Sequence, residues 1–293
     1  MLRHGTDSAT TVCMANQTRT KLIVEIGENH LGNWNLAKGL VREAARAGGT
    51  YAKFQTYTAE QFGRDHRWYE DFKVVELPES MHFELQETCR ESGIEFLSSS
   101  FTKRSNAFLV DRMGLTELKI ASSRVPRLEL LEDVNRRADQ VKTVYLSTGG
   151  CTMDEIRAAV RALDRIEHLH LLHCISQYPT EDTNVNLRMM LDLHREFPEL
   201  PFGYSDHSRG IEAVCAAVAM GATVIEKHFT YHVDIPGDDH EGAWTPQTLA
   251  ETVRRLRRIE EMLGSDRKAP IDGEASALPA LRADLGEVGF DKT

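Results

Sequence analysis

The feature that most constrains this fold is a strict alternation of short apolar runs and helix-like segments. Each apolar run has the length of a buried strand, and each is followed by apolar residues at the spacing of an amphipathic helix. The expected strands are 21–27, 51–55, 94–98, 117–121, 141–146, 169–173, 201–204 and 222–227, and the expected helices are 35–47, 79–92, 103–113, 127–137, 153–164, 185–197, 210–220 and 245–263. This alternation predicts a parallel sheet covered by helices, and eight units predict closure into a (β/α)8 TIM barrel.

The structural alternative is a doubly wound open sheet. A dinucleotide-binding version has little support, because no G-x-G-x-x-G motif follows the first apolar run. We expect a single domain in which residues 1–20 form a flexible tail, residues 21–263 the catalytic barrel, and residues 264–293 a C-terminal tail with at most one short helix around 275–285.

Charge and cysteine content bear on the class of protein. The formal net charge of −10, with no basic block, argues against general nucleic-acid binding but not against a small anionic substrate. The cysteines are widely spread, odd in number and without C-x-x-C spacing, which favours reduced thiols: Cys13, Cys89, Cys151, Cys174 and Cys215. No apolar run approaches the roughly 20 residues that span a bilayer, and residues 1–20 lack an apolar signal core. We therefore expect a cytoplasmic protein that binds no membrane.

Polar residues at the C-terminal strand ends are the candidate site, because barrel enzymes place their chemistry there. His207 and His228 end two successive apolar segments, and neutral imidazole is a common ligand of first-row metals. One strand-end histidine is more often structural. Two at matching positions, with Ser205, Asp206 and Asp239 nearby, favour a metal site.

Two lysines and several hydroxyls at other strand ends suit an anion with many oxygens, such as a phosphate plus a carboxylate. The alternative is that Lys53 and Lys119 are interior residues paired with Glu25 or Glu226. Because unpaired charges are rarely buried, that interpretation also places a polar network in the barrel mouth. The long segment after the second strand is either functional or a cover over the mouth, and it contains Phe62, Trp68, Tyr69 and Phe72.

These residues lie in segments that resemble the sialic acid synthase family, the phosphoenolpyruvate-dependent N-acetylneuraminate synthases and their relatives. In family order, the matching segments are EIGENHLG (25–32), KFQT (53–56), KIAS (119–122), LSTG (146–149), LHC (172–174), YPT (178–180), GYSDH (203–207), EKHFT (226–230) and PGDDH (236–240). Each segment alone is a weak signal, and together they are specific across residues 21–263.

The resemblance implies a barrel enzyme that condenses phosphoenolpyruvate with the open-chain aldehyde of a sugar. It implies a divalent metal on His207 and His228, usually Mn²⁺, with Mg²⁺ or Co²⁺ as alternatives. It implies that phosphoenolpyruvate contacts Lys53, Ser99, Lys119, Ser122, Ser147, Ser176 and Ser205, with Ser99 where the family commonly has threonine. Gln55, Tyr178 and Asp239 would face the sugar, and Glu25, Glu226 and Asp239 are the candidates for proton transfer. A homo-oligomer is left open.

Three departures from the family pattern stand out. Arg124 replaces a usual acidic residue, and Ala243 stands at a usual serine. Residues 264–293 leave no room for the antifreeze-like domain that contacts the acyl group of the amino sugar in family members. We therefore expect an aldehyde other than N-acylmannosamine.

Two further hypotheses compete with this one. A pyruvate aldolase would form a Schiff base on Lys53, Lys119 or Lys227, although the period of two in a strand places Lys227 on the face opposite Glu226 and His228. A non-catalytic relative would bind a sugar acid or a protein partner.

Overall fold

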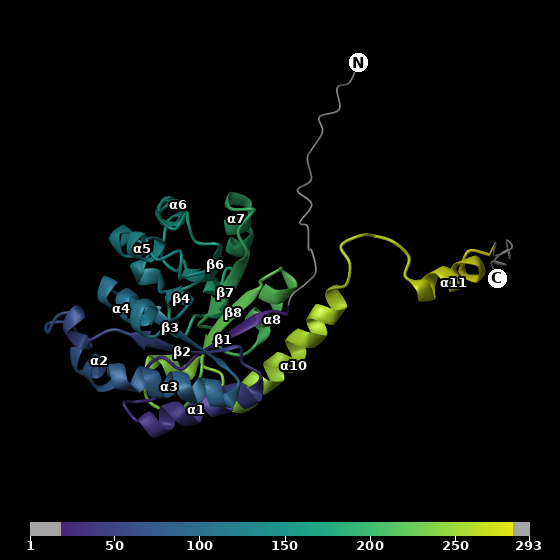
Figure 1. Cartoon of the computed structure of the whole chain (residues 1–293). Helices are drawn as coiled ribbons and strands as arrows, with labels where there is room; N and C mark the ends of the chain where they lie inside the picture. Colours follow the sequence, from purple (N-terminus) through teal and green to yellow (C-terminus); the bar gives the residue numbers. More distant parts are fainter. Residues whose placement is uncertain (1–18, 284–293) are drawn as a thin grey trace, which may run out of the picture. The chain divides into compact units, whose positions relative to one another are not determined.

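Eight parallel strands close into a barrel in the computed structural model, which describes residues 19–283 (Figure 1). The strands are β1 Lys21–Glu25, β2 Tyr51–Thr56, β3 Glu95–Ser100, β4 Glu117–Ile120, β5 Thr143–Ser147, β6 His168–Cys174, β7 Phe202–Asp206 and β8 Val224–His228. Each strand pairs in parallel with the next, and β8 pairs with β1. The (β/α)8 prediction is confirmed, and the open-sheet alternative is wrong.

Helices surround the strands in the order that the sequence predicts (Figure 1). They are α1 Trp34–Ala47, α2 Tyr69–Val75, α3 Glu79–Ser92, α4 Lys103–Ala107, α5 Leu128–Asn135, α6 Met153–Ala162, α7 Met189–Glu196, α8 Glu212–Ala219, α9 Asp238–Glu241, α10 Pro246–Leu263 and α11 Asp272–Leu281. The π-helical segment Phe108–Arg112 continues α4. The sequence analysis did not predict α2 and α9, which lie in the segments that follow β2 and β8.

Local sequence explains where these helices begin and end, as α1 shows. The Asn33 side chain accepts hydrogen bonds from the backbone N–H groups of Asn35 and Leu36, which have no partner inside the helix. Gly48 ends the helix in the left-handed conformation, with φ 94°. Between these caps the apolar face buries Leu40 and Val41 against the sheet side of the molecule.

The barrel has two apolar cores. The larger one lies between the strands and the helices, where outward-facing strand residues pack. The smaller one fills the barrel interior and consists of Ile23, Tyr51, Leu97, Tyr145, Leu172 and Val224. Because this inner plug comes from the N-terminal and middle parts of the strands, the inward-facing residues at the C-terminal strand ends are left to form a polar mouth.

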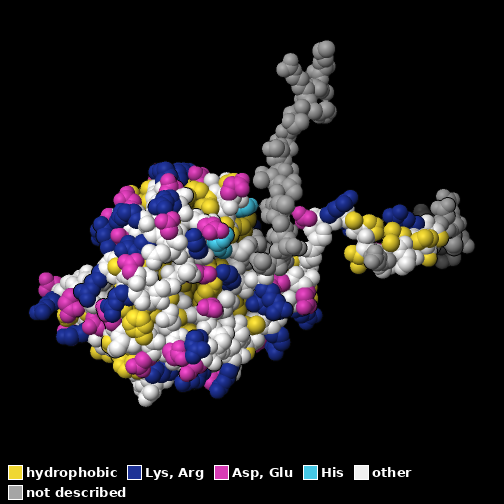
Figure 2. Space-filling model, viewed as in Figure 1, with side chains coloured by type: hydrophobic (Ala, Val, Ile, Leu, Met, Phe, Trp, Pro, Cys, Tyr) yellow, Lys and Arg dark blue, Asp and Glu magenta, His cyan; other side chains and the backbone are white. Residues whose placement is uncertain are grey.

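The barrel forms one compact unit, Thr18–Met262, and α11 belongs to a second unit. The helix expected at 275–285 is observed as Asp272–Leu281. Of the tail expected at 1–20, residues 1–18 lie outside the described residues, as do Cys13 and residues 284–293. Within the described part, Cys89, Cys151, Cys174 and Cys215 are free thiols, and no helix is long and apolar enough to cross a membrane. Figure 2 shows Lys and Arg interspersed with Asp and Glu on the visible face.

Candidate active site

A cavity of about 360 Å³ opens at the C-terminal ends of the barrel strands. Of the polar residues that the sequence analysis singled out for the site, all except Asp206 and Asp239 line this cavity: Glu25, Lys53, Gln55, Ser99, Lys119, Ser122, Ser147, Ser176, Tyr178, Ser205, His207, Glu226 and His228. Asp206 and Asp239 line a smaller adjoining cavity together with Tyr178, His207 and His228. The strand ends therefore bring the predicted residues together, as a closed parallel barrel requires.

The floor of the cavity is a buried network of lysines and glutamates. Lys53 forms ion pairs with Glu25 and with Glu226, the latter at 3.2 Å, and its ammonium donates to Ser99 Oγ at 2.8 Å. Lys119 lies 3.3 Å from the second oxygen of Glu226. The interior pairing that we considered as an alternative is thus present, and it lies in the cavity.

Burial and charge act against each other in this network. Burial by itself would raise the pKa of Glu226, but Lys119 and Lys53 hold it down at about 2. Burial and the neighbouring Lys53 lower the pKa of Lys119 despite the attraction of Glu226. For Lys53 the two carboxylates outweigh burial, and its pKa is raised. Glu226 is therefore a carboxylate shared between two ammonium groups.

Hydroxyl and amide groups surround one side of the lysines. The backbone N–H of Gly149 donates a hydrogen bond to Ser122 Oγ at 2.9 Å. The same Ser122 Oγ lies 3.1 Å from Cys174 Sγ. Ser147 Oγ is buried and has no hydrogen-bond partner within the described chain. A buried hydroxyl without a partner is costly, so this one is suited to a bound oxyanion.

His207 and His228 face each other across the cavity wall, with ring centroids 5.5 Å apart. His207 Nδ1 donates to the carbonyl oxygen of Ile175 at 2.7 Å, which leaves the lone pair on Nε2. His228 Nδ1 lies 3.4 Å from Asp239 Oδ2. Burial lowers the pKa of each imidazole to about 4, so both rings are neutral near pH 7 and can accept a metal.

A buried ion pair behind the two imidazoles fixes the strand ends that carry them. Asp206 and Lys227 are register partners on β7 and β8, and each immediately precedes one of the histidines. Lys227 pairs with Asp206 Oδ2, while Asp206 Oδ1 accepts from Tyr204 Oη at 2.9 Å and from Ser208 Oγ at 2.7 Å. Lys227 therefore faces away from the cavity, as the period of two predicts.

The structure adds Glu28, Tyr57 and Phe101 to the site, none of which the sequence analysis named, beside Phe62, Trp68 and Phe72, which it did name. Glu28, in the turn after β1, lines the cavity, and its Oε1 accepts a hydrogen bond from Tyr57 Oη at 2.6 Å. The segment after β2 contributes an aromatic wall, which we define as Tyr57, Phe62, Trp68 and Phe72 together with Phe101. The prediction that this segment is functional or covers the mouth is consistent with its position. The signal for Glu28 was its place three residues after a strand that ends in Glu25.

The two substituted family positions lie at the edge of the site. The Arg124 guanidinium stacks over Phe62 and Phe101, 5.9 and 5.5 Å from their ring centroids, and Arg124 is not among the residues that line the cavity. Ala243 is buried next to Trp244, close to the end of β8.

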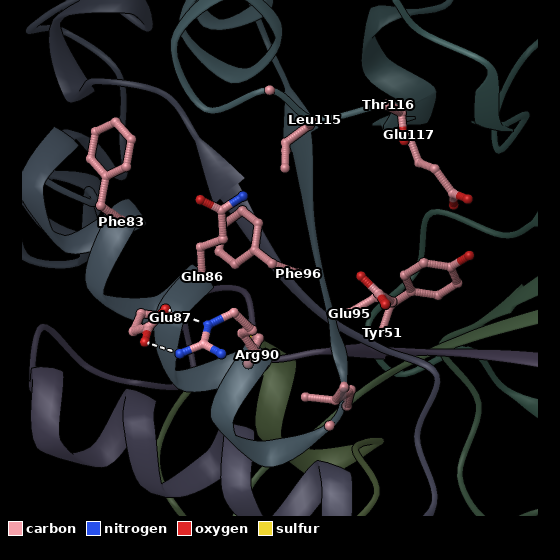
Figure 3. Close-up of a pocket in the computed structure, with 14 residues that line it drawn as sticks. Tyr51, Phe83, Gln86, Glu87, Arg90, Glu95, Phe96, Leu115, Thr116 and Glu117 are labelled. Atoms are coloured by element: carbon pink, nitrogen blue, oxygen red, sulfur yellow. Dashed lines mark hydrogen bonds and ion pairs between the residues drawn. The ribbon is translucent and has the colours of Figure 1, made fainter.

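A larger hollow of about 910 Å³ lies at the opposite end of the barrel, where β2, β3 and β4 begin. Figure 3 shows Arg90 paired with Glu87 on one side and Tyr51, Glu95 and Glu117 on the other. None of the residues predicted for the site lines it.

Comparison with known proteins identifies the group to which this barrel is related. The model of the NeuB family matches residues 40–268. The chain belongs to the NeuB family. It is 37% identical over 285 residues to the N,N'-diacetyllegionaminic acid synthase of Legionella pneumophila, and the aligned region covers 90% of this chain and 79% of that protein. It is 32% identical over 262 residues to the human N-acetylneuraminate-9-phosphate synthase, covering 84% of this chain and 72% of that one.

A solved structure supports the same relationship. The N-acetylneuraminic acid synthetase of Leptospira borgpetersenii, crystallised with citrate, superimposes with a TM-score of 0.85 at 33% identity, over 91% of this chain and 93% of that one. The resemblance that the sequence motifs indicate is thereby confirmed. The roles of the individual residues remain predictions.

Proposed function

We propose that the protein condenses phosphoenolpyruvate with the open-chain aldehyde of a sugar, giving a 3-deoxy-2-keto acid and phosphate. The observation that carries this proposal is the placement of two buried lysines, Lys53 and Lys119, in the same cavity as two neutral imidazoles. Membership of a family whose relatives are named as sialic and legionaminic acid synthases supports it. We propose residues 21–263 as the catalytic unit.

The floor of the cavity suits phosphoenolpyruvate. Lys53 and Lys119 would neutralise its phosphate and carboxylate, and Ser147 Oγ and the Ser122–Gly149 turn would supply directional donors. Ser99, Ser176 and Ser205 would complete this set. These groups are held in place by the strands before the substrate arrives, which is the condition for strong electrostatic stabilisation.

The two imidazoles fit a divalent metal, for which we propose Mn²⁺, with Mg²⁺ or Co²⁺ as alternatives. His207 fits because the carbonyl of Ile175 fixes its tautomer with Nε2 unprotonated. Within residues 19–283 no group of three His, Cys, Asp or Glu side chains has the spacing of a metal site, so the protein would supply these two ligands. When bound, such an ion polarises a carbonyl oxygen as a Lewis acid.

In the reaction, the enol carbon of phosphoenolpyruvate forms a bond to the aldehyde carbon, and the aldehyde oxygen takes a proton. Water adds to C2, and loss of phosphate from the hemiketal leaves the ketone. Glu25, Glu226 and Asp239 would be the candidates for moving these protons, and Gln55 and Tyr178 would orient the sugar.

The aldolase alternative is less well supported by the geometry. Lys227 is engaged with Asp206 outside the cavity, and Lys53 and Lys119 are both paired with carboxylates. A Schiff base requires a neutral amine, which the raised pKa of Lys53 opposes; Lys119, whose pKa burial lowers, is the lysine that this alternative would use.

The test is phosphate release from phosphoenolpyruvate with Mn²⁺ across a panel of aldoses. His207→Ala and His228→Ala should each abolish turnover and bound Mn²⁺, the latter measured by electron paramagnetic resonance. His168→Ala is the matched control, because His168 is an exposed residue at the other end of the barrel. This variant should leave turnover and Mn²⁺ binding unchanged. Near-normal rates in either cavity variant after metal removal would contradict the proposal.

A further inference from the structure

Asn29 is a buried residue in the turn after β1, next to the pairing of β1 with β8 that closes the barrel. Its side chain is 2% exposed, and its backbone N–H donates to the carbonyl oxygen of Ile26 at 2.8 Å, which holds the turn together. The side-chain Nδ2 donates to two backbone carbonyl oxygens across the pairing, that of Phe229 at 3.1 Å and that of Asp239 at 3.2 Å. One amide group thus uses both of its N–H bonds on a single segment of the chain.

The two carbonyls belong to residues 229–244, the segment that follows β8. The start of this segment is anchored by the strand pairing, because the Phe229 N–H donates to the carbonyl oxygen of Glu25 at 2.7 Å. Its two ends lie together, since Phe229 and Trp244 form an isolated β-bridge. Asn29 adds a tie at a point between these ends.

The position of Asp239 in this segment matters because the residue lies beside a proposed metal ligand. Its Oδ2 is 3.4 Å from Nδ1 of His228, and it lines the smaller cavity together with Tyr178 and His207. Asn29 holds the backbone carbonyl of the same residue, so its amide fixes the point from which the carboxylate projects. Asn29 itself is not among the residues that line either cavity.

We infer that Asn29 is a positioning residue, which holds the carboxylate of Asp239 against His228 by tying the segment 229–244 to the turn after β1. This inference rests on the proposed function, in which Asp239 faces the sugar and is a candidate for proton transfer. The tie requires an amide side chain, because two carbonyl oxygens need two N–H donors and an aspartate of the same shape offers acceptors only. A displacement of about 1 Å in a reacting group can lower a rate by about 100-fold, so the tie should have a measurable effect on turnover.

The first experiment measures kcat and KM of Asn29→Asp with the aldose that the wild type converts fastest. We expect kcat/KM for this aldose to fall by about 10- to 100-fold. The KM for phosphoenolpyruvate should stay within about twofold, because β2 and β4 hold Lys53 and Lys119 in place rather than the segment after β8. Asn29→Ser, which adds no charge and keeps one donor, should lose activity in the same direction.

The matched control is Asn33→Asp, the same substitution four residues further along the chain. Asn33 is exposed, and its side chain accepts hydrogen bonds at the start of α1, which an aspartate can also do. Neither kinetic constant should change in this variant. A drop in turnover with Asn33→Asp as large as with Asn29→Asp would overturn the inference.

A double-mutant cycle determines whether Asn29 acts through Asp239. Asp239→Asn changes the carboxylate but keeps the backbone carbonyl, so the tie to Asn29 persists. With Asp239→Asn already present, adding Asn29→Ser should lower kcat/KM by less than about twofold, because residues that act together are not additive. Equal losses in both backgrounds contradict the inference, since Asn29 would then act on turnover by another route.

Hydrogen exchange of the ligand-free protein, followed by mass spectrometry, gives a readout that needs no turnover. In Asn29→Ser the amides of residues 229–244 should exchange at least about tenfold faster than in the wild type, while those of β4 keep their rate. Asp239→Asn should leave the exchange of the segment unchanged. Unaltered exchange of the segment in Asn29→Ser overturns the inference. Faster exchange confined to the segment, in a protein whose wild type converts no aldose, would instead refute the proposed function and leave the tie standing.

Discussion

The carboxyl group of Glu28 makes a measurable contribution to how the stability of the barrel depends on pH. In the folded protein its pKa is about 7, against an ordinary value of 4.5, because it is buried beside Asp239. Between these two values the folded protein keeps the proton that the unfolded chain has lost. The stabilising contribution is therefore complete below about pH 4.5 and disappears as the pH rises to about 7.

The magnitude follows from the interval between the two pKa values. Each pKa unit is worth about 1.4 kcal/mol, so the loss between pH 4.5 and pH 7 amounts to about 3 kcal/mol. Glu28→Gln has no proton to lose. The difference in free energy of unfolding between the variant and the wild type should therefore grow in favour of the variant by about 3 kcal/mol from pH 4.5 to pH 8.

Urea denaturation of both proteins between pH 4.5 and pH 8, followed by circular dichroism, measures this difference. Comparing the two proteins at each pH cancels the titration of all other groups. Glu87→Gln is the control, since its exposed carboxylate should add no pH dependence over this range. A difference that stays flat within about 0.5 kcal/mol would refute the argument, because it would show that Glu28 is not held in an acidic, buried environment.

Two other substitutions test the barrel framework. Lys227→Met leaves the Asp206 carboxylate buried without its ion-pair partner, and the free energy of unfolding measured by urea denaturation should fall by about 3–5 kcal/mol. Adding Asp206→Asn to the same chain should recover part of this loss, and no recovery would contradict the pairing. Gly203→Ala places a methyl carbon 2.4 Å from the backbone oxygen of Val224 on the neighbouring strand, and we expect a loss of about 1–3 kcal/mol. An unchanged midpoint would show that β7 and β8 can separate freely there.

The fold and most of the cavity lining could be predicted from the sequence, because both follow from short-range periodicity. The alternation of strands and helices predicts the closed barrel, and a barrel brings the C-terminal ends of all its strands to one face. The period of two in β8 then separates His228, which lines the cavity, from Lys227, which does not.

The residues that the sequence analysis missed lie outside the regular strands, where hydrophobic periodicity does not predict which way a side chain points. Glu28 follows Gly27, whose φ of 49° turns the chain back over the barrel mouth, and no spacing rule predicts that turn. Tyr57 and Phe101 join the aromatic wall through ring contacts with Phe62, a residue that the sequence analysis did name. Such contacts are long-range packing, which a single sequence does not encode in its pattern.

The seam at which the barrel closes runs through the cavity. Glu25, at the end of the first strand, is the register partner of His228, at the end of the last, and Ser205 is the partner of Glu226. A nascent chain that has emerged only as far as β7 would hold Lys53 and Lys119 without Glu226 between them and would carry one imidazole of the pair. Catalytic competence should thus appear during synthesis only after β8 has left the ribosome. A circular permutant that links the end of α10 to the start of β1, where Thr20 contacts Glu260, should retain it.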